Sequence, residues 1–464
     1  MKFTIPAKGK GTPKRVARVK LVETKEDEVV RLADGTVEIA LGIGVRDEMT
    51  RRKFFLLPRR AVMAGKGRRA ERIFVDFREL RFTQLKMTDE EIAELFATNA
   101  EMAGYEYRQY RTKPEEGFQD VKEIVFEHAD GKGIRAGLAR GKIIGEETNA
   151  ARRLANMPGS DVTPATLAAE ARNIARKLGR NVKVKVLGVP EMKKLGMGGV
   201  LGVGRGSDAP PRFIVLEYAG GKKTEKPLVL VGKGVTYDTG GINLKPEVAM
   251  EGMNMDMSGG AAVLHALAAA VRLGVKRNIV VLIPSVENMP SGSSYRPGDI
   301  IRSMSGKTIE VDNTDAEGRI ILADALTYAK RYDPAFVVDV ATLTGAALVA
   351  LGQRAAALFT VDEEMERKFR DWGEESGDLV WPLPLWDEYD EDIKGTFGDI
   401  RNLGKTRWGG TITAATFLKQ FADGYPWAHI DIASRMTAIE GEHLAKGAAG
   451  APVRLLVWML CEWE

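Results

Sequence analysis

The sequence contains very little cysteine. Among its 464 residues there is one cysteine, Cys461, so no disulfide can form within the chain. A single thiol in a chain of this length is typical of a reducing compartment. We therefore expect a cytoplasmic protein, and the first residues, MKFTIPAKGKG, agree because they lack the apolar centre of a signal peptide.

Histidine is also scarce. The four histidines, His128, His265, His429 and His443, are far apart and none belongs to an HExxH motif. A zinc site built on histidine is therefore excluded. Any metal ion would be held mainly by oxygen ligands or by a less usual ligand. His429 lies in an apolar strand-like run, where we expect a structural role.

Long apolar runs and nucleotide-binding loops are absent as well. No uninterrupted apolar stretch approaches the roughly 20 residues that span a bilayer, so we expect no membrane-spanning helix. The pattern GxxxxGK[ST] of a phosphate loop does not occur. Gly202-x-Gly204-x-Gly206 follows no clear strand and lacks the spacing of a dinucleotide loop. These gaps argue against nucleotide binding.

Charge is nearly balanced, with a net charge of +4 over the whole chain. The local exception is a basic excess near the N-terminus, formed by Lys8, Lys10, Lys14, Arg15, Arg18, Lys20, Arg51, Arg52, Lys53, Arg59, Arg60, Lys66, Arg68 and Arg69. This excess leaves open an alternative function as a DNA-binding or regulatory protein. Aromatic residues that would stack on bases are not interleaved with it, which favours a solvated face instead.

What is present is an ordinary globular composition, with 44% apolar and 28% charged residues. Residues 1–145 alternate short strands with helical stretches, which predicts a small N-terminal α/β domain. Residues 146–464 predict a larger catalytic domain with a mostly parallel or mixed sheet flanked by helices, because strands rich in Val, Ile and Leu alternate with amphipathic helices.

The expected strands are Val182–Val186, Arg212–Tyr218, Pro227–Val231, Asn278–Val286, Ala335–Val340 and Ala428–Ile432. The expected helices are Ala165–Leu178, with Thr163 as N-cap and Pro164 at N1, and Ser258–Leu273, Arg319–Tyr332 and Ala414–Phe421.

Four carboxylates, Asp238, Asp256, Asp315 and Glu317, stand at predicted strand-to-helix junctions of this sheet. Asp238 lies in the glycine-rich stretch from Gly232 to Lys245, for which we expect tight turns. Ligands bind past the carboxyl ends of strands in such sheets. Four converging carboxylates need positive partners to remain ionised. Lysines and an arginine would give a structural ion network, and divalent cations would give a two-metal site. For Asp315 and Glu317 alone, a helix cap is a further alternative.

The second half of the chain resembles the leucyl aminopeptidase (cytosol aminopeptidase) family. The motif NTDAEGR at 313–319 is similar to the signature of that family. Further blocks follow the family's order: GKGVTYDTGGINLK (232–245), MNMDMSGGAA (253–262), ENMPSGSSYRPGDI (287–300), DVATLTGA (339–346), GGTITAATFL (409–418) and AHIDIA (428–433). The resemblance extends over roughly residues 146–464.

This resemblance implies a metal-dependent aminopeptidase that releases N-terminal, leucine-like residues from peptides. The metal ligands that it implies are Lys233, Asp238, Asp256, Asp315 and Glu317, which would hold two divalent ions, Mn²⁺ or Zn²⁺. It also implies Lys245 as the group that stabilises the oxyanion and Arg319 as the seat of a bicarbonate general base. The residues that it implies for substrate binding are Met253, Asn313, Thr342, Leu343 and Gly345. Met253 could instead be part of the apolar core, and so could the group formed by Thr342, Leu343 and Gly345.

Two further expectations come from the resemblance. Family members form hexamers, so we expect a homohexamer. Asn254 stands where the family usually has lysine, next to an implied ligand rather than at one. We therefore expect this substitution to tune the site without inactivating it.

Overall fold

The computed structural model describes residues 1–5, 16–33 and 35–463. By compactness the chain divides into two units. Unit 1 comprises Met1–Asn149 with Ala438–Lys446, and unit 2 comprises Ala150–Thr437 with Gly447–Glu464. No helix in the described part is long and apolar enough to cross a membrane.

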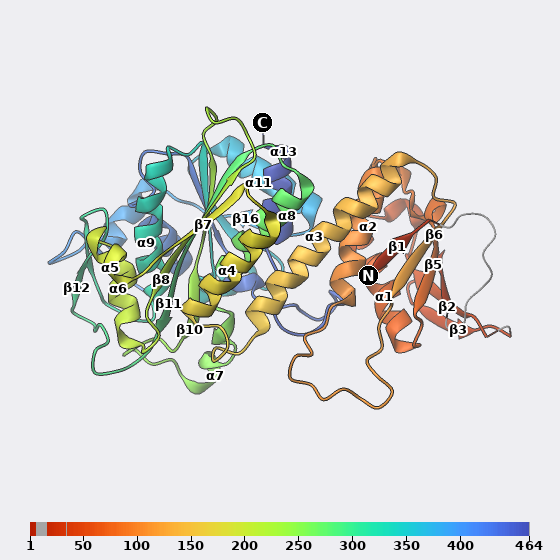
Figure 1. Cartoon of the computed structure of the whole chain (residues 1–464), viewed down its shortest axis with the longest axis horizontal. Helices are drawn as coiled ribbons and strands as arrows, with labels where there is room; N and C mark the ends of the chain where they lie inside the picture. Colours follow the sequence, from red (N-terminus) through yellow and green to blue (C-terminus); the bar gives the residue numbers. More distant parts are fainter. Residues whose placement is uncertain (6–15, 34, 464) are drawn as a thin grey trace. The chain divides into compact units, whose positions relative to one another are not determined.

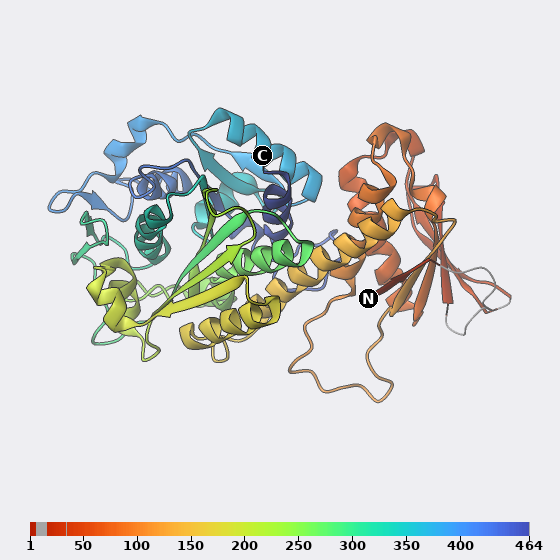
Figure 2. The ribbon, with the colours of Figure 1, turned by 45° about the horizontal axis from the view of Figure 1, so that its top comes forward.

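Unit 1 is built on a six-stranded sheet with the order β1-β6-β5-β2-β4-β3. Its strands are β1 (Lys2–Thr4), β2 (Val16–Val22), β3 (Glu28–Arg31), β4 (Val37–Gly42), β5 (Arg72–Asp76) and β6 (Glu123–Glu127). Its helices are α1 (Arg51–Gly67), α2 (Asp89–Gly104) and most of α3 (Lys132–Asn156). Every pairing is parallel except that of β3 with β4. Helices α1 and α2 pack together beside this sheet over one apolar core (Figure 2).

The basic excess of the sequence lies in unit 1. Lys8, Lys10, Lys14 and Arg15 fall outside the described residues. Several of the others pair with carboxylates, namely Arg18 with Glu127, Arg60 with Asp27 and Arg69 with Glu116. Part of the positive charge that motivated the DNA-binding alternative is therefore neutralised within the unit.

Unit 2 contains a mixed nine-stranded sheet with the order β16-β15-β18-β14-β9-β11-β8-β7, and β10 pairs additionally with β11. Its strands are β7 (Val182–Leu187), β8 (Arg212–Ala219), β9 (Leu228–Gly232), β10 (Gly234–Asp238), β11 (Asn278–Asn288), β14 (Phe336–Ala341), β15 (Ala356–Thr360), β16 (Val380–Pro382) and β18 (Trp427–Asp431). A small second sheet is formed by β12 (Ile300–Arg302), β13 (Thr308–Glu310) and β17 (Ile400–Arg401). The predicted fold class, α/β with a mostly parallel or mixed sheet, is confirmed.

The helices of unit 2 cover both faces of the large sheet. They are α4 (Pro164–Leu178), α5 (Val189–Lys194), α6 (Gly198–Val203), α7 (Glu247–Met250), α8 (Ser258–Leu273), α9 (Glu317–Ala329), α10 (Gly345–Leu351), α11 (Glu363–Ser376), α12 (Gly410–Lys419) and α13 (Val453–Glu462). Figure 1 shows α9 on one side of the central strands and α4 and α8 on the other. The N-cap of α4 is Thr163, whose side chain accepts from the Thr166 amide, and Pro164 opens the helix as predicted.

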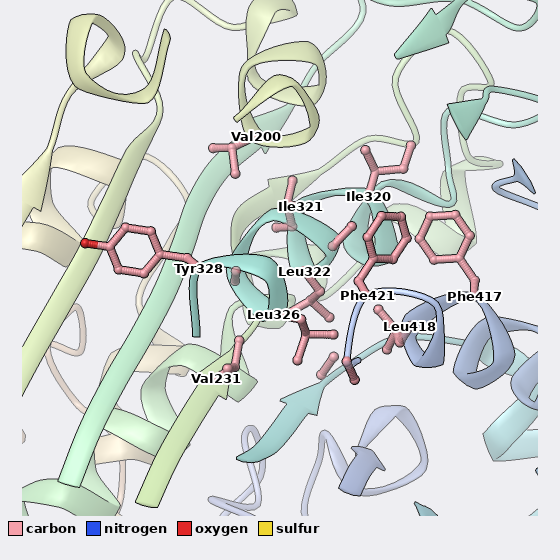
Figure 3. Close-up of a cluster of buried hydrophobic side chains, with 14 of the residues drawn as sticks. Val200, Val231, Ile320, Ile321, Leu322, Leu326, Tyr328, Phe417, Leu418 and Phe421 are labelled. Atoms are coloured by element: carbon pink, nitrogen blue, oxygen red, sulfur yellow. The ribbon is translucent and has the colours of Figure 1, made fainter. Parts of the chain in front are cut away.

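Helix α9 is buried along nearly its whole length. Its apolar side chains pack with Val231 of β9, with α6 and with Phe417 and Phe421 near α12 (Figure 3). Ile320, Ile321 and Leu322 have no exposed surface. The close-packed interior therefore fixes the first turn of α9, which begins two residues after Asp315.

Two predicted boundaries differ from the structure in a way that matters for the site. The strand expected at Asn278–Val286 continues to Asn288. Part of the stretch for which we expected tight turns, Gly234–Asp238, is strand β10, which lies parallel to the end of β11. Gly234 permits this close pairing, because a Cβ there would lie 2.7 Å from Ile283 Cγ2 and 2.8 Å from the Pro284 carbonyl oxygen.

Candidate metal centre and active site

The strands that carry the candidate residues end at one edge of the large sheet. Strands β9, β10, β11, β14 and β18 are mutually parallel where they pair, so their carboxyl ends meet there. Lys233 directly follows β9, and Asp238 is the last residue of β10. Thr342 directly follows β14. Asp256 lies just before α8, and Glu317 is the first residue of α9.

Three of the predicted carboxylates converge in this place. Asp238, Asp315 and Glu317 each offer one oxygen, and these oxygens all lie within 4.8 Å of one another. Hard carboxylate oxygens gathered so closely fit a divalent cation such as Mg²⁺, Mn²⁺ or Zn²⁺. The residues present therefore fit the metal-binding role that the sequence predicted.

Lys233 connects the fourth carboxylate to this group. Its Nζ lies 2.8 Å from Asp256 Oδ2 and 2.7 Å from Glu317 Oε1, and it donates to the Thr342 carbonyl at 2.8 Å. Burial lowers the pKa of Lys233, but Asp256, Glu317 and Asp238 together outweigh this effect and raise the pKa. The raised pKa favours the ammonium form of Lys233 among these neighbours. Gly318 allows the close approach, because a Cβ there would lie 2.8 Å from Lys233 Nζ.

The carboxylates themselves have raised pKa values. Burial raises the pKa of Asp256 well above its ordinary range, in spite of the opposing charge of Lys233. Burial and the charge of Asp238 raise the pKa values of Glu317 and Asp315. Nearby positive charge, from lysines or from cations, would stabilise the ionised form of these carboxylates.

Lys245 pairs with the two carboxylates of the cluster that Lys233 does not pair with. Its Nζ lies 2.9 Å from Asp238 Oδ2 and also pairs with Asp315 Oδ1. Burial lowers the pKa of Lys245, but Asp238, Glu317 and Asp315 outweigh it, so the pKa is raised. Lys245 is thus a charged donor directed at the carboxylates.

Arg319 is a buried guanidinium group with free donors. It lies in the first turn of α9 and is 5% exposed. Within the described chain, no acceptor reaches its Nε or Nη1. Burial lowers its pKa to about 10, while Glu317 and Asp431 act in the opposite direction. A buried, planar guanidinium group with unused N–H donors is suited to binding a planar anion.

The residues predicted for substrate binding have different surroundings. Thr342 donates from its hydroxyl to Asp256 Oδ1 at 2.6 Å, so this side chain is engaged with a candidate ligand. Asn313 accepts from the Asp315 amide at 2.7 Å. Leu343 is half-buried and packs against the apolar core. Gly345 is exposed with open space around it, and Met253 is half-buried just before Asp256.

Asn254, the departure from the family pattern, is directed at backbone groups. Its Nδ2 donates to the carbonyl oxygens of Ala155 at 3.1 Å and Met157 at 3.0 Å. It therefore anchors the segment before Asp256 to the end of α3. Among the described residues, its side chain makes no hydrogen bond to the four carboxylates.

Sequence analysis missed two buried amides that hold the ligand loops. Asn402 accepts from the Asp312 amide at 2.8 Å and donates to the Asn313 carbonyl at 2.6 Å. Asn288 donates to Asp238 Oδ1 at 2.8 Å and to the Thr314 carbonyl at 2.9 Å. The only signal in the sequence was the place of Asn288 within the block ENMPSGSSYRPGDI.

His429 has the structural surroundings that we expected. It lies in β18 opposite Asp339 of β14, and its Nδ1 is 2.6 Å from Asp339 Oδ1. Trp427 Nε1 donates to the other oxygen of Asp339 at 2.6 Å. All three residues are buried. Burial lowers the pKa of His429, but Asp339 outweighs it and the pKa is raised.

This pair predicts a pH-dependent contribution to stability. Because the pKa of His429 is raised in the folded state, its stabilisation is complete below the ordinary value of about 6.5 and is lost as the pH rises through the folded pKa. His429→Gln keeps a donor but cannot titrate. We expect the difference in free energy of unfolding between wild type and this variant to shrink as the pH rises above about 6.5, measured by urea denaturation. A difference that does not change with pH would contradict this role.

The fold and the site together define a class: an α/β protein with a largely buried cluster of carboxylates, suited to divalent cations, at the carboxyl edge of its sheet. The model of the cytosol aminopeptidase family, catalytic domain, matches residues 149–457. A probable cytosol aminopeptidase of Aromatoleum aromaticum is 51% identical over 327 residues, which cover 70% of this chain and 64% of that protein. A probable cytosol aminopeptidase of Syntrophotalea carbinolica is 47% identical over 364 residues, covering 77% and 73%.

A solved structure agrees with these matches. The bottromycin maturation enzyme BotP in complex with Mn has a TM-score of 0.84 and 33% identity, covering 96% of this chain and 98% of that one. The chain therefore belongs to the cytosol aminopeptidase family, a family of metal-dependent hydrolases. The match spans slightly less than two thirds of the length of the Aromatoleum relative. The comparisons give no support to the DNA-binding alternative.

Proposed function

We propose that this protein is a metal-dependent aminopeptidase that hydrolyses the first peptide bond of peptides and prefers leucine-like N-terminal residues. The observation that carries the proposal is the convergence of Asp238, Asp315 and Glu317, within the region that matches the family's catalytic domain. Residues 146–464 would form the catalytic domain and residues 1–145 a separate N-terminal domain. We also propose a cytoplasmic location and a homohexamer, as the resemblance implies.

The proposed metal centre holds two divalent cations, Mn²⁺ or Zn²⁺. Asp238, Asp256, Asp315 and Glu317 would hold the cations through their carboxylate oxygens. The Mn complex of BotP supports manganese as one occupant. Lys233, whose pKa is raised by the neighbouring carboxylates, would have to lose its proton to bind, and adjacent cations would favour that loss. When bound, the cations lower the pKa of a water molecule and polarise the scissile carbonyl.

Two cationic side chains would do the remaining chemistry. Lys245, whose pKa is raised, would keep its proton and stabilise negative charge on the carbonyl oxygen in the transition state. Arg319 would hold a bicarbonate ion through its unused donors, and that anion would serve as the general base. The half-buried Met253 and Leu343, together with Asn313, Thr342 and Gly345, would receive the side chain of the N-terminal residue.

This proposal is tested by the requirement for a free α-amine. Leucyl p-nitroanilide should be hydrolysed in the presence of Mn²⁺, whereas the N-acetylated compound should react at least about 100-fold more slowly, since the amine would be a metal ligand. Mass spectrometry of a longer peptide should show release of single residues from its N-terminus. Comparable cleavage of the acetylated compound, or cleavage at internal bonds, would contradict the proposal.

A further inference from the structure

We infer that Asn288 is a positioning residue that turns Asp238 into a one-oxygen ligand and sets its distance from Asp315. This inference rests on the proposed function, because it concerns the same metal centre. It concerns a side chain that itself touches neither of the proposed catalytic groups, Lys245 and Arg319. Its action would pass entirely through Asp238 and the backbone of the Asp315 loop.

Asn288 is placed for this role by the pairing of two strands. It is the last residue of β11, and its register partner in β10 is Asp238, also the last residue of its strand. The Asn288 side chain is completely buried. Its Nδ2 donates to Asp238 Oδ1 at 2.8 Å and to the Thr314 carbonyl oxygen at 2.9 Å. One amide group thus connects two candidate ligand loops.

The orientation of this amide follows from its partners. A carboxylate and a backbone carbonyl only accept hydrogen bonds, so the NH₂ group must face them. The amide oxygen, Asn288 Oδ1, has no hydrogen-bond donor among the described residues. It faces Gly241, where a Cβ would lie 2.8 Å away. A buried acceptor left unpaired costs stability, so an asparagine would not be expected here unless the two bonds that its amide donates mattered.

The consequence for Asp238 is that one of its oxygens is fully used. Oδ1 accepts from the Gly240 amide at 2.9 Å as well as from Asn288. The other oxygen, Oδ2, lies 2.9 Å from Lys245 Nζ, which also pairs with Asp315. With Oδ1 held by two N–H groups, Asp238 can offer Oδ2 alone to a cation.

The hydrogen bond from Asn288 to the Thr314 carbonyl sets the spacing between Asp238 and Asp315. Thr314 precedes Asp315, and its carbonyl receives both Asn288 Nδ2 and the Tyr295 hydroxyl, the latter at 2.6 Å. Tyr295 is therefore a natural control, because it supports the same carbonyl without touching Asp238. If Asn288 acts by orienting Asp238, its loss should affect cation binding far more than loss of the Tyr295 hydroxyl.

The test is titration of the metal-depleted protein with Mn²⁺ by isothermal calorimetry, on wild type, Asn288→Asp, Asn288→Ala and Tyr295→Phe. We expect wild type to bind two ions. In both Asn288 variants one ion should bind about 10- to 100-fold more weakly, which is the effect of losing a partner that orients a ligand. The other ion should bind almost as in wild type. Tyr295→Phe should keep both affinities within about threefold, well short of the loss of such a partner.

The outcomes separate this inference from the proposed function. If wild type binds no Mn²⁺, the proposed function itself fails. If wild type binds two ions and both Asn288 variants do so with unchanged affinities, the positioning role is refuted. If Tyr295→Phe weakens binding as much as Asn288→Ala, anchoring of Thr314 explains the effect and the orientation of Asp238 does not. Should Asn288→Asp fail to fold because of its added charge, the uncharged Asn288→Ala decides.

Discussion

Glu317→Gln is expected to reduce kcat for leucyl p-nitroanilide by more than about 100-fold, because even partners outside the metal ligands contribute 10- to 100-fold in comparable sites. The substitution preserves the shape of the side chain and removes its charge. Glu317 is the carboxylate that pairs with Lys233 and also belongs to the group with Asp238 and Asp315. The same loss should follow chelation of wild type, with recovery when Mn²⁺ or Zn²⁺ is added back. The variant itself should not recover.

The matched control for this substitution is Glu363→Gln. Glu363 is the first residue of α11, as Glu317 is of α9, but it is exposed and remote from the cluster. The control carries the same change at the same helix position, so it accounts for any effect on the helix dipole. Wild-type turnover in Glu317→Gln, or activity that survives thorough metal removal, would refute the metal centre.

Lys245→Met is expected to lower kcat by about 10²- to 10³-fold, the usual effect of removing one donor to a developing oxyanion. The methionine side chain has a similar length and no charge. Because the proposed ligands are retained, the number of bound metal ions should stay close to that of wild type. Kinetics with leucyl p-nitroanilide and metal analysis of the purified variant measure the two quantities separately.

Lys223→Met provides the comparison, since Lys223 is an exposed lysine in a loop of the same unit. It should leave both quantities unchanged. If Lys245→Met instead loses its metal ions, Lys245 would be a structural counter-ion to Asp238 and Asp315, and its assignment to the oxyanion would be wrong.

The parts of the site that sequence analysis predicted are those encoded within short stretches. Asp315, Glu317 and Arg319 lie two positions apart in the sequence, so their proximity needs only a loop that enters a helix. Asp238 and Asp256 could be placed because each follows or precedes an element with clear hydrophobic periodicity. The α/β fold was predictable for the same reason, since buried strands and amphipathic helices alternate through unit 2.

What sequence analysis missed depends on contacts between distant segments. Asn288 and Asn402 are ordinary polar residues until the fold brings them against Asp238 and the Asn313 loop. Strand β10 was missed because glycine-rich sequence predicts turns, and only its partner β11 makes it a strand. Segment Ala438–Lys446 packs with unit 1 although it lies near the end of the chain. Local patterns carry no information about such pairings.

The burial of α9 limits which substitutions are compatible with the geometry of the site. Glu317 and Arg319 lie at the start of a helix whose remaining residues fill the interior between β9 and α12. Exchanges at exposed positions away from the site leave the packing of that helix unchanged. A change of side-chain volume at a position such as Leu322 would instead shift the helix. The proposed ligand Glu317 and the proposed anion-binding Arg319 would then move together. The geometry of the proposed site therefore depends on core residues such as Leu322, which are not among its proposed ligands or catalytic groups.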